Sequence, residues 1–216
     1  RNVNALLRLT TNLINFERAD TYSSALYVSE YELSTYMEEM INAFRAYADV
    51  KRISLTYESN FRYMNTWLDK DKMDSILKNL ISNALKYTPE GGSVHIYTAE
   101  TEDYWSVEVK DTGIGIPSSE QKKLFKIHFR GSNAINSKVT GSGIGLLLVW
   151  KLVHLHKGKI NFTSTEGKGS CIKVTFPKGE KPYRKAIHSP KPGSEKVAYA
   201  ESGVPKNVTP NIAYDA

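Results

Sequence analysis

With 216 residues, of which 40% are hydrophobic, the chain is long enough for one well-buried α/β domain with appendages. Its single cysteine, Cys171, excludes a disulfide framework and is typical of a reducing compartment. The net charge of +6 does not indicate a nucleic-acid partner, because half of the excess lies from Lys178 onward (seven Lys and Arg against four Asp and Glu) and the remaining residues contain no Arg-rich helix.

No apolar run approaches the ~20 residues that a membrane-spanning helix needs, so we expect no membrane contact from this chain. The sequence begins at Arg1 without an initiator methionine or a signal peptide. We therefore interpret it as a cytoplasmic fragment of a longer protein, which could carry a membrane anchor elsewhere.

The first part of the chain predicts a short helix followed by a linker. Within residues 1–18, apolar side chains recur at spacings of three and four, at Leu6, Leu9, Leu13 and Phe16. The spacing fits either about two heptads of a coiled-coil seam or the buried stripe of a helix packed on its own domain. Residues 22–30 predict a linker, so 1–30 are expected to precede the main domain.

Residues 31–177 predict an alternation of helices and strands and are the expected main domain. Helical spacing or strand-like alternation of apolar residues predicts, in order, a helix at 32–49, strands at 53–58 and 61–67, a helix at 69–87 with Asp69 or Asp71 as N-cap, strands at 93–100 and 104–110, a helix at 144–156, and a hairpin at 159–164 and 169–176. Six of the eight prolines lie from Pro177 onward, so we expect 178–216 to be a linker or a disordered tail.

The helix at 69–87 carries a polar face. On a helix of about 3.6 residues per turn, Asn79, Asn83 and the pair Lys86 and Tyr87 lie on one side, opposite the apolar stripe. An amide oxygen can bind Mg²⁺, and amide, ammonium and phenol groups can donate to the oxygens of a phosphate chain. Taken alone, a solvated helix face is the favoured interpretation.

The second segment follows the strand at 104–110 directly and reads Asp111-Thr112-Gly113-Ile114-Gly115-Ile116-Pro117. Asp111 shares the parity of the apolar residues of that strand, so its carboxylate is predicted to point to the buried side of the sheet. A buried carboxylate needs a donor, which an adenine amino group supplies. Gly113 and Gly115 would let the backbone approach a flat ring closely, although a single G-x-G after a strand is common in tight turns.

The third segment reads Gly141-Ser142-Gly143-Ile144-Gly145-Leu146 and opens the helix at 144–156. Glycines at a helix start leave N–H groups exposed at the positive end of the helix dipole, where phosphates bind. A Rossmann loop is excluded because no strand feeds this segment, and a P-loop is excluded because the chain has no Gly-Lys-Ser/Thr.

In this order and spacing, the three segments resemble the N, G1 and G2 boxes of the family that groups gyrase, the large heat-shock chaperone, histidine kinases and mismatch-repair ATPases. The histidine-kinase branch is most similar, since the likeness continues at 124–130, 155–158 and 166–170 and covers about residues 53–177. The fold implied is a two-layer α/β sandwich, with a mixed, largely antiparallel sheet covered on one face by three helices.

The resemblance also implies cofactors, ATP and Mg²⁺, and a role for each matching residue. Asn83 would coordinate Mg²⁺ and Asp111 would bind the adenine amine, with Gly113 and Gly115 making room for the ring. The implied catalytic residues, which contact or flank the phosphates, are Asn79, Lys86 and Arg130. Residues that would complete the nucleotide pocket or frame and form its lid are Tyr87, Phe125, Thr140, Gly141, Ser142, Gly143, Gly145 and Leu146.

The implied activity is transfer of the γ-phosphoryl group of ATP to a histidine on a segment outside this chain, and from there to an aspartate on a response regulator receiver domain. The second implied partner is the dimerisation and phosphoacceptor domain of the parent protein, in a homodimer. Residues 1–18 resemble only the second helix of that domain. Four of the five histidines of this chain are interpreted as strand, helix or tail residues rather than as the acceptor: His95, His154, His156 and His188.

Other functions remain open. The family usually has an acidic-basic-Phe-Tyr-Arg run where this chain has Lys126-Ile127-His128-Phe129-Arg130, which would suit a non-catalytic ATP-binding regulatory module. A serine-directed anti-sigma kinase has the same boxes, and the Pro-rich tail would suit a hybrid sensor. A gyrase-type or chaperone-type ATPase is disfavoured, because those relatives hold a Glu as general base at the position of Asn79, and an amide cannot take a proton at neutral pH.

Overall fold

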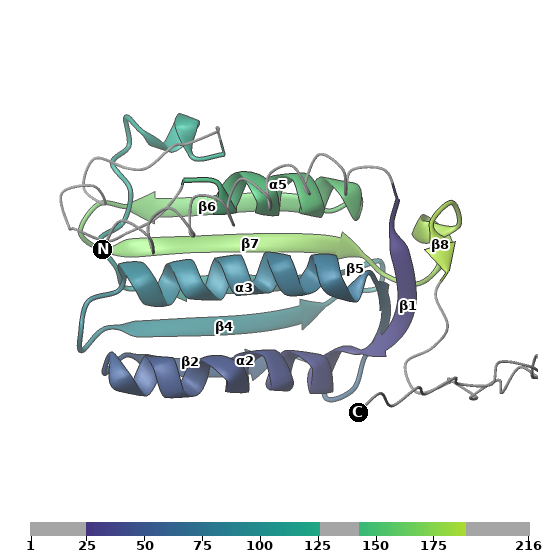
Figure 1. Cartoon of the computed structure of the whole chain (residues 1–216), viewed down its shortest axis with the longest axis horizontal. Helices are drawn as coiled ribbons and strands as arrows, with labels where there is room; N and C mark the ends of the chain where they lie inside the picture. Colours follow the sequence, from purple (N-terminus) through teal and green to yellow (C-terminus); the bar gives the residue numbers. More distant parts are fainter. Residues whose placement is uncertain (1–24, 126–142, 189–216) are drawn as a thin grey trace, which may run out of the picture.

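The computed structural model describes residues 25–125 and 143–188. A five-stranded sheet has the order β2-β4-β5-β7-β6, with β2 parallel to β4 and every other neighbouring pair antiparallel. Its strands are β2 (Ser54–Ser59), β4 (Ser93–Glu100), β5 (Tyr104–Asp111), β6 (Lys159–Thr165) and β7 (Gly169–Pro177). The helices α2 (Leu33–Val50), α3 (Lys70–Tyr87) and α5 (Gly145–Leu155) cover one face of this sheet (Figure 1), as the sequence predicts.

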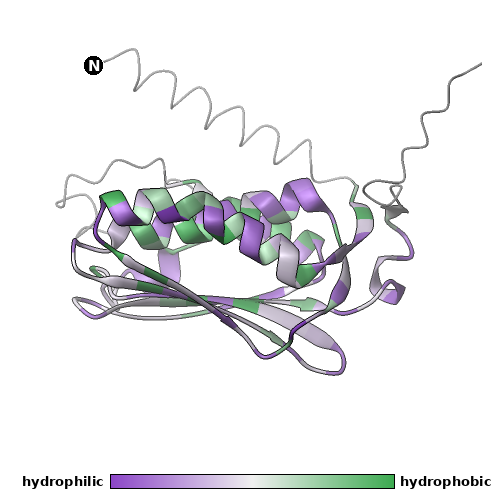
Figure 2. Ribbon diagram, turned by 90° about the horizontal axis from the view of Figure 1, so that it is seen from below, coloured by the Kyte–Doolittle hydropathy of each residue, from purple (hydrophilic) through white to green (hydrophobic). Residues whose placement is uncertain are grey.

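The core lies between the helix layer and the sheet layer, which Figure 2 shows edge-on. Helix α3 runs along the middle and contributes a stripe at helical spacing: Met73, Ile76, Leu77, Leu80, Ile81, Ala84 and Leu85. The sheet contributes alternate residues of its central strands, such as Trp105, Val107 and Val109 on β5. Helix period and strand period therefore bring two apolar faces together, and this hydrophobic burial is the main stabilising term.

The start of α3 is fixed by a buried polar cluster around Asp69, the N-cap. Its carboxylate accepts hydrogen bonds from the backbone N–H and the ammonium of Lys72, at 3.2 and 2.6 Å, and from the N–H of Tyr27 at 2.9 Å. The Asp69 N–H donates to Nε2 of His156 at 3.4 Å, and Nδ1 of His156 lies 2.8 Å from the carbonyl oxygen of Leu152. Each buried charge thus has partners, as burial requires.

A second, three-stranded sheet lies at this same end of the molecule. Its order is β3-β1-β8, with β1 (Tyr27–Glu32) antiparallel to β3 (Asn65–Leu68) and parallel to β8 (Ile187–His188). The sequence predicts a linker over residues 22–30, and this prediction is wrong for residues 27–30, which belong to β1. The segment Tyr-Val-Ser-Glu-Tyr-Glu shows no clean alternation of apolar and polar residues, so its pattern does not predict a strand.

The predicted linker or tail also differs from the structure over residues 178–188. A 3₁₀ turn, η2 (Lys181–Tyr183), leads into β8, and the Tyr183 ring is 1% exposed against Leu26 and Val28. The hydroxyl of Tyr183 donates to the carbonyl of His156 at 3.2 Å. The domain therefore continues past residue 177, its predicted end, to at least His188.

The helix predicted within 1–18 and residues 189–216 lie outside the described residues. Among the helices that the structure describes, none combines the length and the hydropathy that a bilayer span requires.

Candidate functional site

The segments singled out in the sequence meet at one end of the main sheet, where α3 and β5 end and α5 begins. The N–H of Ile114, in the loop after β5, donates to the carbonyl of Tyr87 in the last turn of α3 at 3.2 Å. A Cβ placed on Gly145 would lie 2.5 Å from Oδ1 of Asn79 and 3.9 Å from Nδ2 of Asn83. The first turn of α5 therefore lies directly against the polar face of α3, and a Cβ at position 145 would require the Asn79 amide to move.

Asp111 ends β5 at the point predicted from its parity and is half-buried. Its Oδ1 accepts hydrogen bonds from the N–H of Gly113 at 2.8 Å and from the N–H of Ser170 at 3.2 Å. Burial raises the pKa of this carboxyl above its ordinary value, while the two backbone N–H groups oppose the shift. Both hydrogen bonds end on Oδ1, so within residues 25–125 and 143–188 Oδ2 is the oxygen available to a ligand's donor.

The loop after Asp111 is held in place by the β6–β7 hairpin. Gly115 has φ 63°, and a Cβ there would lie 2.0 Å from the carbonyl oxygen of Thr165. The N–H of Ile116 donates to Oγ of Ser164 at 2.9 Å, and Nε2 of Gln121 donates to the carbonyls of Ile116 and Ser164 at 3.1 and 2.9 Å. Backbone and side chains therefore hold the loop in one conformation beside Asp111.

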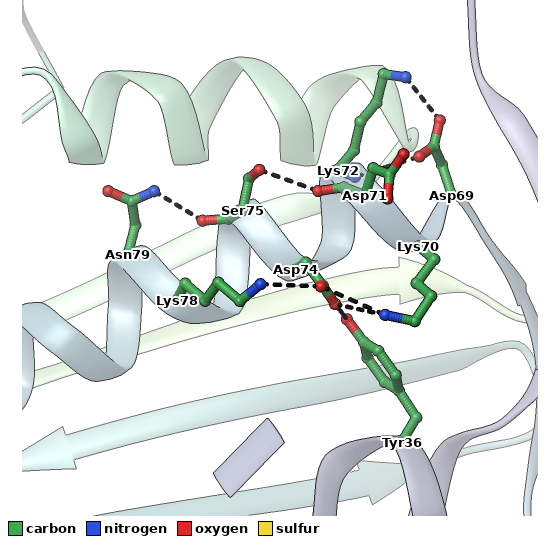
Figure 3. Close-up of polar contacts among 9 residues, drawn as sticks. All are labelled: Tyr36, Asp69, Lys70, Asp71, Lys72, Asp74, Ser75, Lys78 and Asn79. Carbon is green, nitrogen blue, oxygen red and sulfur yellow. Dashed lines mark hydrogen bonds and ion pairs between the residues drawn. The ribbon is translucent and has the colours of Figure 1, made fainter. Parts of the chain in front are cut away.

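The polar face of α3 is prepared by contacts within the helix. Figure 3 shows Nδ2 of Asn79 donating to the carbonyl of Ser75, at 2.7 Å, which leaves Oδ1 directed toward α5. Nζ of Lys86 lies 4.9 Å from the ring centroid of Tyr87. Asn79, Asn83, Lys86 and Tyr87 are all half-buried. The sequence prediction that they share one face of α3 agrees with this arrangement.

A different side of α3 faces α2. Asp74 accepts a hydrogen bond from the hydroxyl of Tyr36, on α2, at 2.7 Å (Figure 3). It also forms ion pairs with Lys78 at 3.0 Å and with Lys70 at 3.4 Å. These contacts add to the burial of the apolar stripe of α3, which sets the rotation of the helix about its axis. In this orientation Asn79 and Asn83 face the start of α5.

Of the residues expected to frame or form a lid, the structure describes four. The ring of Phe125 packs edge-on against Phe162 of β6, with 5.6 Å between centroids. Gly143 has φ 73°, Gly145 begins α5, and Leu146 is half-buried in its first turn. The remaining candidates, Arg130, Thr140, Gly141 and Ser142, lie outside the described residues, so their roles stay predictions.

The donor set suits a nucleotide better than a metal bound by protein side chains alone. Within residues 25–125 and 143–188, no three His, Cys, Asp or Glu side chains form a cluster that could hold a metal ion. Mg²⁺ commonly takes one or two protein oxygens and completes its shell with phosphate oxygens and water. The amide of Asn83, facing the start of α5, fits such a site.

Sequence reasoning missed the residues that support the site. Ser164, Gln121 and Ser170 hold the loop and the carboxylate of Asp111, yet each acts through one hydroxyl, amide or N–H group. No local pattern marks such a residue, because its partner is distant in the sequence. The histidines fall as expected on β4 (His95) and at the end of α5, except that His188 belongs to β8 rather than to a tail.

The family described as "Histidine kinase-, DNA gyrase B-, and HSP90-like ATPase" matches residues 68–180. The chain is 31% identical to histidine kinase P4 of Formosa agariphila over 82% of its own length and 13% of that protein. It is 33% identical to the sensor histidine kinase WalK of Bacillus subtilis over 80% of its own length and 28% of that protein. The chain thus spans less than a third of the length of these relatives.

Solved structures share the fold. The catalytic domain of histidine kinase ThkA superposes with a TM-score of 0.63 at 24% identity, over 71% of this chain and 99% of that one. Full-length ShkA in complex with AMPPNP superposes with a TM-score of 0.70 at 20% identity, over 82% of this chain and 37% of that one. ThkA in complex with the response regulator protein TrrA superposes with a TM-score of 0.64 at 23% identity, over 84% of this chain and 50% of that one. At these identities the likeness establishes the architecture alone.

Proposed function

The chain belongs to the histidine kinase-, DNA gyrase B-, and HSP90-like ATPase family, and from this premise we propose that it is the ATP-binding catalytic domain of a sensor histidine kinase. The observation that carries the proposal is the meeting of Asp111, the asparagine face of α3 and the first turn of α5 at one end of the sheet. Both relatives named above are histidine kinases, and WalK is named as a sensor histidine kinase, which supports the kinase branch of the family.

Adenine recognition falls to Asp111. Its Oδ2 accepts a hydrogen bond from the exocyclic amine of adenine. Its Oδ1 keeps the hydrogen bonds from the N–H groups of Gly113 and Ser170, so the carboxylate is already oriented before adenine binds. Guanine presents a carbonyl oxygen at the same position and would leave the carboxylate facing an acceptor. The site therefore selects adenine nucleotides.

Phosphate binding falls to the asparagine face and the helix start opposite it. The first N–H groups of α5 and the positive end of its dipole attract the phosphates, and Lys86 and Tyr87 add donors. Asn83 offers its amide oxygen to Mg²⁺. When bound, the ion neutralises charge on the phosphates. Arg130, Thr140, Gly141 and Ser142 close the pocket in this proposal.

The residues on the α3 face favour transfer over hydrolysis. Asn79 stands against Gly145 where a gyrase-type or chaperone-type ATPase holds a Glu, and an amide cannot remove a proton from water. The γ-phosphoryl group is thus positioned without activating water, which suits an acceptor histidine on the dimerisation and phosphoacceptor domain of a homodimer. The final acceptor in this proposal is a response regulator receiver domain; the ThkA structure contains a response regulator protein as its partner, which supports this class of acceptor. The reaction draws on ATP, so it takes place in the cytoplasm.

The test is a phosphotransfer assay with the chain supplied as a separate polypeptide. We expect it to bind ATP, to hydrolyse it very slowly, and to phosphorylate a histidine when the parent's dimerisation and phosphoacceptor hairpin is added, giving an acid-labile product. Rapid hydrolysis by the chain alone would favour a conformational ATPase. Tight ATP binding with no transfer would favour a regulatory module, and an acid-stable phosphoserine on an added protein would favour an anti-sigma kinase.

A further inference from the structure

The C-terminal end of α3 is completed by side chains and backbone from other parts of the fold. The last four carbonyls of any α-helix lack partners within the helix. Here the carbonyl of Ala84 accepts from the N–H and hydroxyl of Thr88, at 3.1 and 2.7 Å. The carbonyl of Tyr87 accepts from the N–H of Ile114. The two carbonyls between them, of Leu85 and Lys86, need a different donor.

That donor is Lys51. Its ammonium lies 2.9 Å from the carbonyl oxygen of Leu85 and 3.4 Å from that of Lys86, in a part-buried position. A positive charge at this point also interacts favourably with the negative end of the helix dipole. One side chain from the end of α2 therefore closes the helix that carries the nucleotide-facing residues.

The backbone around Lys51 is itself tied to the turn that follows α3. Lys51 is the C-cap of α2, and its N–H donates to the carbonyl of Tyr47 at 3.2 Å. The N–H of Gly91 donates to the carbonyl of Arg52 at 3.0 Å, and the N–H of Ser54 to that of Gly92 at 3.0 Å. The ammonium is thus presented by a fixed turn, so it can hold the last turn of α3 in place.

The turn held in this way carries Lys86 and Tyr87, and the carbonyl of Tyr87 holds Ile114 in the loop beside Asp111. Lys51 lies outside the three sequence segments that form the candidate site, and its ammonium contacts the site through the last turn of α3. We propose that Lys51 is a positioning residue for the nucleotide site: its ammonium fixes the last turn of α3, and with it the phosphate-facing residues. The inference rests on the proposed function, because it assumes that ATP binds against that turn.

The experiment compares Lys51→Met, which keeps the side-chain stem and removes the charge and donors, with Lys51→Arg, which restores both. Calorimetric titration with ATP and with adenosine is run where chemical denaturation shows each variant to be folded. We expect Lys51→Met to bind ATP about tenfold more weakly, with a smaller loss for adenosine, because misplaced groups cost mainly the phosphate contacts. Lys51→Arg should recover most of the ATP affinity. Lys51→Gln, a neutral donor, serves if the Met variant does not fold.

Lys72→Met is the matched control, because it removes a lysine from the other end of α3, where Lys72 pairs with Asp69. It should lower stability and leave the ATP affinity of the folded protein unchanged. A Lys51→Met variant that loses stability but binds ATP like the wild type overturns the inference and leaves the proposed function standing. Equal losses for ATP and adenosine, without rescue by Arg, also overturn it. A wild-type chain that does not bind ATP overturns the proposed function, and the inference with it.

Discussion

Asp111 offers the sharpest residue-scale test, because one of its oxygens is already used by two backbone N–H groups. Wild-type protein should bind ATP and not GTP, since guanine leaves the carboxylate without a donor at a cost of about 1–3 kcal/mol. Asp111→Asn keeps an acceptor oxygen and removes the charge, so it should weaken ATP binding without unfolding the domain. Calorimetry gives both affinities, and circular dichroism checks the fold. GTP affinity within a few-fold of ATP affinity would exclude this role for Asp111.

The role proposed for Asn83 is tested by measuring how Mg²⁺ changes the affinity for ATP. Asn83→Ala should abolish the gain in ATP affinity that Mg²⁺ provides and leave adenosine binding nearly intact, because adenosine carries no phosphate to share with the ion. Titrations with ATP, with and without Mg²⁺, and with adenosine measure this directly. Equal losses for ATP and adenosine would mean that the substitution damages α3.

The chemistry of these residues could be predicted from the sequence, but the support around them could not. Strand parity was sufficient to orient Asp111, and helical spacing was sufficient to group Asn79 with Asn83. Lys51 has no such signal, because the carbonyls that it binds lie 34 and 35 residues away in the sequence. A lysine at a helix end is common, so the residue type does not identify its partners. Tertiary contacts of this kind depend on how the turns pack.

At the scale of elements, the loop after β5 makes a testable close contact with the β6–β7 hairpin. Gly115 and Gly167 both have positive φ, 63° and 74°, but a Cβ on Gly115 would lie 2.0 Å from the carbonyl oxygen of Thr165, whereas a Cβ on Gly167 would meet no atom within 4 Å. Gly115→Ala should therefore cost about 3 kcal/mol of folding free energy, from strain and overpacking together, and Gly167→Ala about 1 kcal/mol from strain alone. Urea denaturation measures both, and equal losses would contradict the contact.

Elements with a strong period were predicted to within a residue or two, whereas those without one were missed. Helix α3 has an unbroken apolar stripe and an acidic N-cap, and it runs from Lys70 to Tyr87 against a predicted 69–87. The strand predicted at 61–67 narrows to Asn65–Leu68, because part of that range forms the turn after β2. Strand β1 gains its stability from pairing with β3 and β8, and the two-residue β8 from pairing with β1; no window of local sequence contains these partners.

The C-terminal segment makes a prediction about the whole molecule. A chain that ends after Lys178 loses the buried Tyr183 ring and should be less stable by about 3 kcal/mol than a chain that ends after His188. Thermal unfolding measures the difference. Tyr183→Phe in the longer chain keeps the ring and loses only the hydrogen bond to His156, so its cost should be near 1 kcal/mol. Equal stability of the two truncated chains would contradict the packing of this segment.

His156 makes the stability of the whole domain depend on pH. Burial lowers its pKa below the ordinary value of about 6.5, with smaller opposing contributions from the Leu152 carbonyl and Asp69. The unfolded chain then binds a proton more readily than the folded one, so stability is full above pH ~6.5 and falls as the pH drops below it, by at most about 1.4 kcal/mol per pH unit.

Chemical denaturation between pH 7.5 and pH 5 (about the range over which an unfolded histidine titrates) checks this. His156→Phe should flatten the dependence relative to the wild type. His154→Phe, which replaces an exposed histidine on the same helix, should leave it unchanged. Parallel pH profiles for wild type and His156→Phe would contradict the burial of a neutral imidazole.

The pairing of β1 with β8 places both ends of the described chain at one end of the domain, far from the candidate site. The described chain enters at β1 and leaves at β8, side by side, next to Asp69 at the start of α3 (Figure 1). The candidate site lies at the other end of that helix, 18 residues away, or about 27 Å at 1.5 Å per residue. A rotation of about 10° at the small sheet would carry the site through about 5 Å. If the domain rotates as one body about that end, a small rotation would therefore displace the candidate site by several ångströms.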